Sequence, residues 1–185
     1  GHGVSQDHVR AVEWYRRAGN QGLAGAQFNL GGMYENGHGV LQDHVRAMEW
    51  YRKAANQEHA RAQINLANMY KNDHGVSQDY VRAVECYRKA ANQGDADAQS
   101  NLGVMYEERP GGSPDHVRAA EWYTKAANQG LAHAQFNLGL MYANGHGVSQ
   151  DHVRAVELYR KAANQGHAIA QFSLGVMYQN SYGVS

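Results

Sequence analysis

The hexapeptide AQFNLG at residues 26–31 decides the fold, because it returns with small changes at 62–67, 98–103, 134–139 and 170–175. A second hexapeptide, QDHVRA at residues 6–11, returns in the same way at 42–47, 78–83, 114–119 and 150–155. Both series advance by 36 residues, from 26 to 62 and from 6 to 42. A fixed period of this size is typical of solenoids, in which one supersecondary unit stacks on its neighbours.

Each repeat predicts two helices and no strand. The first begins after an aspartate such as Asp7, a favoured N-cap, and carries Ala11 and Tyr15 on one face. The second runs from about Ala24 to Glu35 and ends at a glycine-rich turn. We therefore expect an all-α solenoid of five helix–turn–helix repeats of 36 residues each.

The repeats predict one continuous array over residues 1–185. Its successive repeats occupy residues 1–36, 37–72, 73–108, 109–144 and 145–180, and residues 181–185 begin a further loop. The sequence starts and stops at the same phase, inside a loop between helices. This pattern indicates an excerpt from a longer array.

The charge balance offers no attraction for nucleic acid. Lys+Arg and Asp+Glu both number 17, so the net charge is zero with neutral histidines. No apolar run reaches the roughly 18 residues of a membrane helix.

Cys86 occupies the slot of Trp14 and Trp50, which predicts apolar packing. Because it is the single cysteine, a disulfide framework within the chain is excluded. Cytoplasmic, bacterial periplasmic and secreted locations stay open.

Two glycine slots carry specific expectations. Gly31 lies in the middle of the second helix, where glycine costs about 1 kcal/mol relative to alanine. The slot stays small as Ala67, Gly103, Gly139 and Gly175, which predicts close approach of a neighbouring helix. Gly22 ends the first helix, whereas Glu58 takes its place in the second repeat and predicts a different end there.

Histidines recur in two rows, but they predict no dedicated metal site. One row lies in the loops and the other at the start of the first helices: His2, His38, His74 and His146, and His8, His44, His116 and His152. Because duplication copies a residue into each repeat, we interpret both rows as solvated surface residues, with incidental metal binding as the alternative. Neither the serines in the turns nor Cys86 has a repeated acid–base partner, so we expect no catalytic site and no cofactor.

The repeat closely resembles the Sel1-like repeat, a relative of the tetratricopeptide repeat. The matching residues are AQFNLGLMY at 134–142, NGHGV at 144–148, QD at 150–151 and AVELYRKAA at 155–163. The resemblance implies a right-handed α/α superhelix that serves as an adaptor for protein complexes, a family common in bacteria. Some secreted bacterial members bridge the helices of each repeat with a disulfide and are linked to β-lactam binding, and this chain departs from them in having only Cys86.

Comparison of the repeats predicts a partner-binding stripe on the second helices, which the resemblance places on the inner, concave wall. Its slots vary between repeats while the core slots stay fixed. Its members are Phe28, Arg61, Ile64, Asn68, Lys71, Asp97, Val104, Glu107, His133, Phe136, Leu140, Ile169, Phe172 and Val176. Amides that could clamp a peptide backbone are Asn29, Asn65, Asn101 and Asn137.

These observations favour a non-enzymatic scaffold that binds a peptide or protein in a groove lined by the second helices. Exposed Phe and Ile side chains on one stripe of a solenoid are typical of an interaction surface. A structural or consensus-like array without a dedicated ligand is the alternative, and a β-lactam-binding or β-lactam-hydrolysing protein is a distant one. We expect neither nucleic-acid partners nor membrane insertion, and end-to-end self-association through the two ends stays open.

Overall fold

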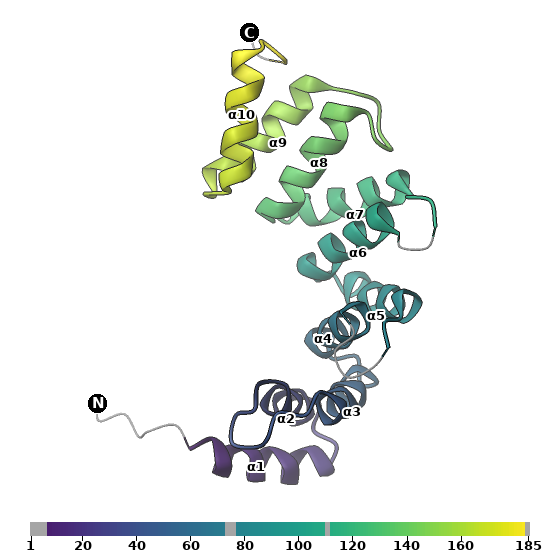
Figure 1. Cartoon of the computed structure of the whole chain (residues 1–185), viewed down its shortest axis with the longest axis vertical. Coiled ribbons are helices and arrows are strands. Elements are labelled where there is room, and N and C mark those ends of the chain that lie inside the picture. Colours follow the sequence, from purple (N-terminus) through teal and green to yellow (C-terminus); the bar gives the residue numbers. More distant parts are fainter. Residues whose placement is uncertain (1–6, 73–76, 110–111, 184–185) are drawn as a thin grey trace, which may run out of the picture. The chain divides into compact units, whose positions relative to one another are not determined.

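The computed structural model describes residues 7–72, 77–109 and 112–183, and over these residues every regular element is a helix. The ten helices follow one another along the chain (Figure 1). Their bounds are α1 (His8–Asn20), α2 (Ala24–Asn36), α3 (His44–Ala55), α4 (Ala60–Lys71), α5 (Tyr80–Asn92), α6 (Ala96–Glu108), α7 (His116–Asn128), α8 (Ala132–Asn144), α9 (His152–Asn164) and α10 (Ala168–Gln179).

The helices fall into two compact units, Gly1–Gln93 with α1–α5 and Gly94–Ser185 with α6–α10. In unit 1, α2 packs on α3 and α4 on α5, and in unit 2, α6 packs on α7 and α8 on α9. An even-numbered helix therefore packs on the odd-numbered helix that follows it. The expected all-α repeat solenoid is confirmed for the described residues.

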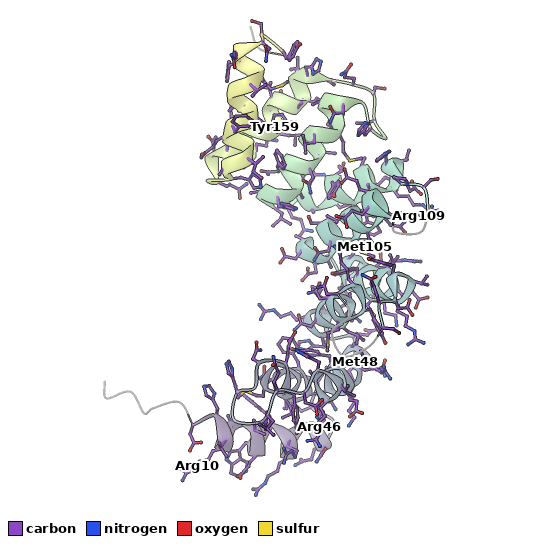
Figure 2. The ribbon with its side chains drawn as sticks, viewed as in Figure 1. Arg10, Arg46, Met48, Met105, Arg109 and Tyr159 are labelled. Carbon is purple, nitrogen blue, oxygen red and sulfur yellow. The ribbon has the colours of Figure 1, made fainter. Side chains whose placement is uncertain are left out.

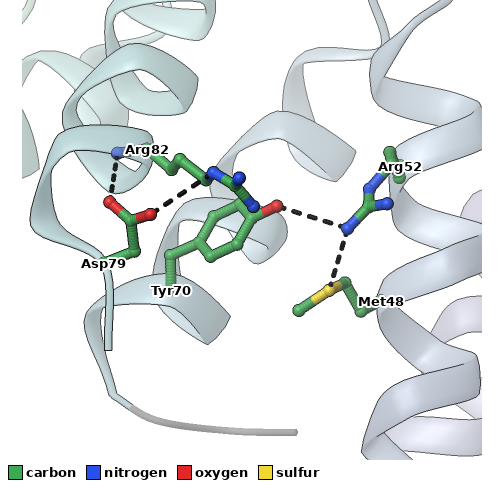
Figure 3. A network of polar contacts seen from close by, with 5 residues as sticks. All are labelled: Met48, Arg52, Tyr70, Asp79 and Arg82. Carbon is green, nitrogen blue, oxygen red and sulfur yellow. Dashed lines mark hydrogen bonds and ion pairs between the residues drawn. The ribbon is translucent and has the colours of Figure 1, made fainter. Parts of the chain in front are cut away.

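Aspartate side chains begin the odd-numbered helices, as the sequence predicts. The Asp43 Oδ1 accepts a hydrogen bond of 2.9 Å from the backbone N–H of Arg46, and the Arg46 Nε lies 3.3 Å from Asp43 Oδ2. Asp7, Asp79, Asp115 and Asp151 cap their helices in the same way. Figure 3 shows one of these caps and a neighbouring hydrogen bond. Asp79 accepts from the backbone N–H of Arg82 and pairs with its guanidinium. Arg52 donates a hydrogen bond of 3.4 Å to the Tyr70 hydroxyl.

The expected close approach is confirmed at Gly31, Gly103 and Gly139, whereas a Cβ on Gly175 would meet no heavy atom within 4 Å. A Cβ atom placed on Gly31 of α2 would lie 2.7 Å from the ring of Tyr51 of α3, and one on Gly103 of α6 would lie 2.6 Å from the ring of Tyr123 of α7. Real Cβ contacts are longer than this, so these rings occupy the space that a Cβ on the glycine would need. The buried ring offsets the helix propensity that glycine loses.

The end of α3 differs from the expectation. Gly22 follows α1 with a φ of 94°, a left-handed conformation that glycine adopts readily. Glu58 adopts the same conformation after α3, with a φ of 61°, and its backbone N–H donates to the Ala55 carbonyl at 3.1 Å as Gly22 does to Gly19. The prediction of a different corner was therefore wrong, because these hydrogen bonds outweigh the cost of the glutamate Cβ.

The loop between α2 and α3 is fixed at both of its ends by contacts with α1 and α2. Gly39 has a φ of 71°, and a Cβ there would overlap the backbone carbonyl of His8. Four residues later, Asp43 donates its backbone N–H to the Tyr34 carbonyl at 2.9 Å and caps α3. The second glycine of the Gly-His-Gly turn is thus needed both for its conformation and for its contact with the preceding odd helix.

Candidate partner-binding face

The predicted stripe lies on the even-numbered helices, and each unit carries its own part. In unit 1, α2 and α4 hold Phe28, Asn29, Arg61, Ile64, Asn65, Asn68 and Lys71. In unit 2, α6, α8 and α10 hold Asp97, Asn101, Val104, Glu107, His133, Phe136, Asn137, Leu140, Ile169, Phe172 and Val176. We call these sets the unit-1 stripe and the unit-2 stripe.

The unit-2 stripe exposes large apolar side chains. Phe172 is 73% exposed, Ile169 is 59% exposed, and Leu140 of α8 is also exposed. Asp97 and His133 add exposed polar groups at the starts of α6 and α8. The exposed side chains of Ile169 and Leu140 leave apolar surface in water that a partner could cover.

Phe136 does not share this exposure, so the expectation of an exposed ring there was wrong. Its ring centroid lies 5.7 Å from that of Tyr159 and 4.9 Å from that of His167, and the side chain is only 8% exposed. In unit 1, Phe28 packs in the same way on Tyr51 and His59. This slot faces the seam between successive repeats.

Tyrosine hydroxyls reach the stripes from the odd-numbered helices, which sequence reasoning missed. The Tyr51 hydroxyl donates to Glu35 Oε2 at 2.5 Å, and the Asn65 amide hydrogen-bonds to the same hydroxyl. In unit 2, the Tyr123 hydroxyl donates to Glu107 Oε2 at 2.8 Å. The recurrence of a glutamate 16 residues before the tyrosine is the signal that could have revealed these pairs.

Burial and these carboxylates change the acidity of the phenols. Burial, followed by the neighbouring Glu35, raises the pKa of Tyr51 well above its usual value of 10. The pKa of Tyr123 moves in the same direction, caused first by burial and then by Glu107. Hydrogen bonding with the side chains of Asn65 and Asn137, which we expected to clamp a peptide backbone, lowers the pKa of the same phenols by less than burial and the carboxylates raise it.

Tyr87 and Tyr159, which hold the same slot as Tyr51 and Tyr123, lack the hydrogen bond to a glutamate. Lys71 stands where the first repeat has Glu35, and the Tyr87 hydroxyl donates instead to Asn68 Oδ1. Burial raises the pKa of Tyr87 to about 12 and that of Tyr159, labelled in Figure 2, also to about 12. Both stripes thus lie over a row of protonated phenols.

The two histidine rows pack against each other. His8 stacks on His38 with centroids 5.0 Å apart, and His116 stacks on His146 at 4.9 Å. His2 and His74 lie outside the described residues. No cluster of three or more metal-binding side chains occurs within residues 7–72, 77–109 and 112–183.

Cys86 lies in a partly buried position on α5, in line with its predicted packing role. Burial raises the pKa of its thiol to about 11, so the thiolate that nucleophilic chemistry requires is scarce at neutral pH. Of the helices described, none is long and apolar enough to cross a membrane.

Comparisons with known proteins agree with this geometry. The Sel1 repeat family model matches residues 1–23, 24–59, 60–95, 96–131, 132–167 and 168–185. No curated protein matches the chain. Among solved structures, c5321, a protective antigen of uropathogenic Escherichia coli with an SLR fold, is 41% identical with a TM-score of 0.93, and the match covers 97% of this chain and 38% of the antigen.

Two further structures extend the comparison. A Sel1 repeat protein from Oxalobacter formigenes is 37% identical with a TM-score of 0.84, over 95% of this chain and 70% of that protein. The immunity protein Pa5087 from Pseudomonas aeruginosa is 26% identical with a TM-score of 0.55, over 90% of this chain and 62% of that protein. The chain spans well under half of the Escherichia coli antigen.

Proposed function

Since the chain belongs to the Sel1 repeat family, we propose that it is a non-enzymatic scaffold that binds a protein or peptide through the unit-2 stripe. Sel1 repeat proteins are generally protein-interaction scaffolds. The observation that supports this site is the exposure of Ile169 of α10 and Leu140 of α8. Burial of such side chains by a partner is favourable by about 25 cal/mol for each Å² of apolar surface.

The character of the unit-2 stripe favours a segment with apolar side chains spaced along one face. Leu140 on α8 and Ile169 on α10 offer apolar contacts from two helices of the same unit. Asp97 is an exposed carboxylate that α6 contributes to the stripe, and a basic residue at one end of the bound segment would complement it. An amphipathic peptide with a basic end meets both requirements.

A random-peptide display library panned against the purified chain tests this proposal. Selected peptides should bind the Leu140→Ser/Ile169→Ser variant at least about tenfold more weakly, because anchor side chains typically contribute more than 1 kcal/mol each. The matched control is Val117→Ser/Val153→Ser, which alters two similarly exposed apolar side chains on the odd-numbered helices of the same unit.

Two outcomes would contradict the proposal. Peptides that lose affinity equally for both double variants would move the site away from the unit-2 stripe. A library from which no peptide is enriched over an unrelated protein would favour the alternative, a structural array without a dedicated ligand.

A further inference from the structure

We propose that α7 and the loop between α8 and α9 form a site for an arginine side chain of a partner protein. Four repeats carry their own arginine at one slot of the odd-numbered helix, as Arg16, Arg52, Arg88 and Arg160, whereas the fourth repeat carries Thr124 there. The partner's guanidinium would take the place that the chain's own arginine takes in the other repeats. None of the residues of the unit-2 stripe belongs to this site.

Arg52 of α3 shows what occupies this place in unit 1 (Figure 3). Its Nη2 donates to the Tyr70 hydroxyl at 3.4 Å and to the Met48 sulfur at 3.4 Å. Arg82 lies over the same ring, 5.7 Å from its centroid. Tyr70 thus contacts two guanidinium groups, one at its hydroxyl and one over its face. The bond to the hydroxyl recurs at 3.1 Å for Arg16–Tyr34 and at 2.7 Å for Arg160–Tyr178.

Unit 2 has the equivalent tyrosine, Tyr142, but not the arginine on the helix before it. Two repeats further along the chain, Thr124 replaces the arginine and Ala120 replaces the methionine. Thr124 donates its hydroxyl to the Ala120 carbonyl at 2.7 Å, within its own helix. Arg154 lies over the Tyr142 ring at 5.5 Å and donates to the Tyr142 hydroxyl at 3.2 Å. Because a hydroxyl oxygen has two acceptor lone pairs, Tyr142 can still accept from a second guanidinium.

The smaller side chains leave a hollow of about 550 Å³ on the surface of unit 2. Its lining includes three apolar and three polar side chains: Val117, Ala120 and Val148, and Glu121, Thr124 and Lys125. The stem of an arginine suits the apolar part, and its guanidinium suits the exposed carboxylate of Glu121. One wall is held in place without a ligand, because Gly147 packs so closely on α7 that a Cβ would overlap the His116 carbonyl. A preformed hollow lowers the entropic cost of binding.

The positive charges near the hollow are compatible with a further cation. Lys125 lies 3.8 Å from the ring centroid of Trp122. In unit 1, the equivalent Lys53 lies 4.0 Å from that of Trp50, and Arg52 binds its tyrosine beside it. A guanidinium also fits better than an ammonium, since its planar fork can donate to the tyrosine hydroxyl and to the glutamate carboxylate at once.

The hollow favours an arginine of a protein chain over a free amino acid. It opens on a helix surface where Val117 is 58% exposed, so the side chain can enter while its backbone stays on the partner. Arginine is among the residues that contribute most at protein interfaces. Only the partner's being a protein rests on the proposed scaffold function, whereas the guanidinium site rests on the contacts of α7.

A titration with N-acetyl-arginine amide, followed by the NMR signals of the backbone amides, tests the site. This probe has uncharged ends, like a residue within a protein chain. The amides of Thr124 and Val148 should shift in a saturable way, with half-saturation at about 1–10 mM, as expected for one side chain. N-acetyl-lysine amide should bind at least about fivefold more weakly. Free L-arginine should bind no more tightly than the capped probe.

Two variants exchange the hollow between the units. Thr124→Arg restores the arginine of the other repeats and should abolish the shifts. Met48→Ala/Arg52→Thr opens the same hollow in unit 1 and should add a second set of saturable shifts around Tyr70. If circular dichroism shows that this double variant has lost helix, Arg52→Thr alone replaces it, because Arg52 is exposed.

Two further variants separate this site from the unit-2 stripe. Leu140→Ser/Ile169→Ser should leave binding of the probe unchanged. Val117→Ser/Val153→Ser removes apolar lining from the hollow and should weaken binding, so a peptide that is weakened by this variant alone uses the hollow. The proposal would be overturned by the absence of a saturable shift at α7, by equal binding of the arginine and lysine probes, by tighter binding of free arginine, by shifts that survive Thr124→Arg, or by a unit-1 variant without the second site.

Discussion

Gly103→Ala and Gly175→Ala make the same chemical change at the same slot of two repeats, and we expect opposite effects on stability. In α6, the new Cβ would lie 2.6 Å from Tyr123 Cε1 and 2.7 Å from Cδ1, and this ring is fully buried. Overpacking of this kind typically costs about 1–3 kcal/mol, against a helix-propensity gain of about 1 kcal/mol. Gly103→Ala should therefore lower the free energy of unfolding by up to about 2 kcal/mol.

Gly175→Ala lacks the opposing cost. No heavy atom lies within 4 Å of its new Cβ, so the helix-propensity gain of about 1 kcal/mol should appear as added stability. Urea unfolding followed by far-ultraviolet circular dichroism measures both variants. A Gly103→Ala protein as stable as Gly175→Ala would refute the assignment of Gly103 to a tyrosine contact. Ala67, which is buried in this slot of α4, shows that a Cβ can be accommodated where the neighbouring side chains have adjusted to it.

Three further predictions concern strain, ionisation and the core. Glu58→Gly should raise the free energy of unfolding by about 1 kcal/mol, measured by urea unfolding, because glycine adopts the left-handed conformation without the Cβ cost. Tyr87 and Tyr159 should ionise with a pKa near 12, and a phenolate absorbance titration in which all tyrosines ionise near pH 10 would contradict this. Since the unfolded phenols ionise first, stability should fall as pH rises from 10 to 12. Leu102→Ala should lower the free energy of unfolding by about 2–5 kcal/mol, and Arg61→Ala should lower it far less, as melting temperatures would show.

The sequence predicted most of the fold because its signals are local. The N-cap at Asp43, the helix start at Ala24 and the small residue at Gly31 all depend on neighbours within one repeat or on the constant period. Copying a unit at a fixed spacing also copies its packing partner. Burial of Leu102 and Tyr87 followed for the same reason.

The candidate site was less predictable because its environment comes from the next repeat. Phe136 shares a helical stripe with Leu140, yet it is buried by Tyr159 and His167 on elements that follow it. The Tyr51–Glu35 hydrogen bond likewise joins side chains on successive helices, and no pattern within one helix reveals it. At Glu58, the preference of left-handed positions for glycine predicted a different turn, but the backbone hydrogen bonds of the turn outweigh this preference.

The two corners of a repeat should differ sharply in how they tolerate an added side chain. Between Gly39, fixed against His8, and Asp43, bound to Tyr34 and capping α3, the loop has no slack, although surface loops usually accept insertions. At the other corner, between α7 and α8, a Cβ placed on Gly130 would meet no heavy atom within 4 Å. Gln129 Nε2 donates to Gln99 Oε1 and Gln165 Nε2 donates to the Gly130 carbonyl, both at 2.9 Å, so this corner is also tied into the stack and should not accept inserted residues. Fluorophores or epitopes therefore belong on a single side chain in this slot, which Glu58 already provides in the second repeat.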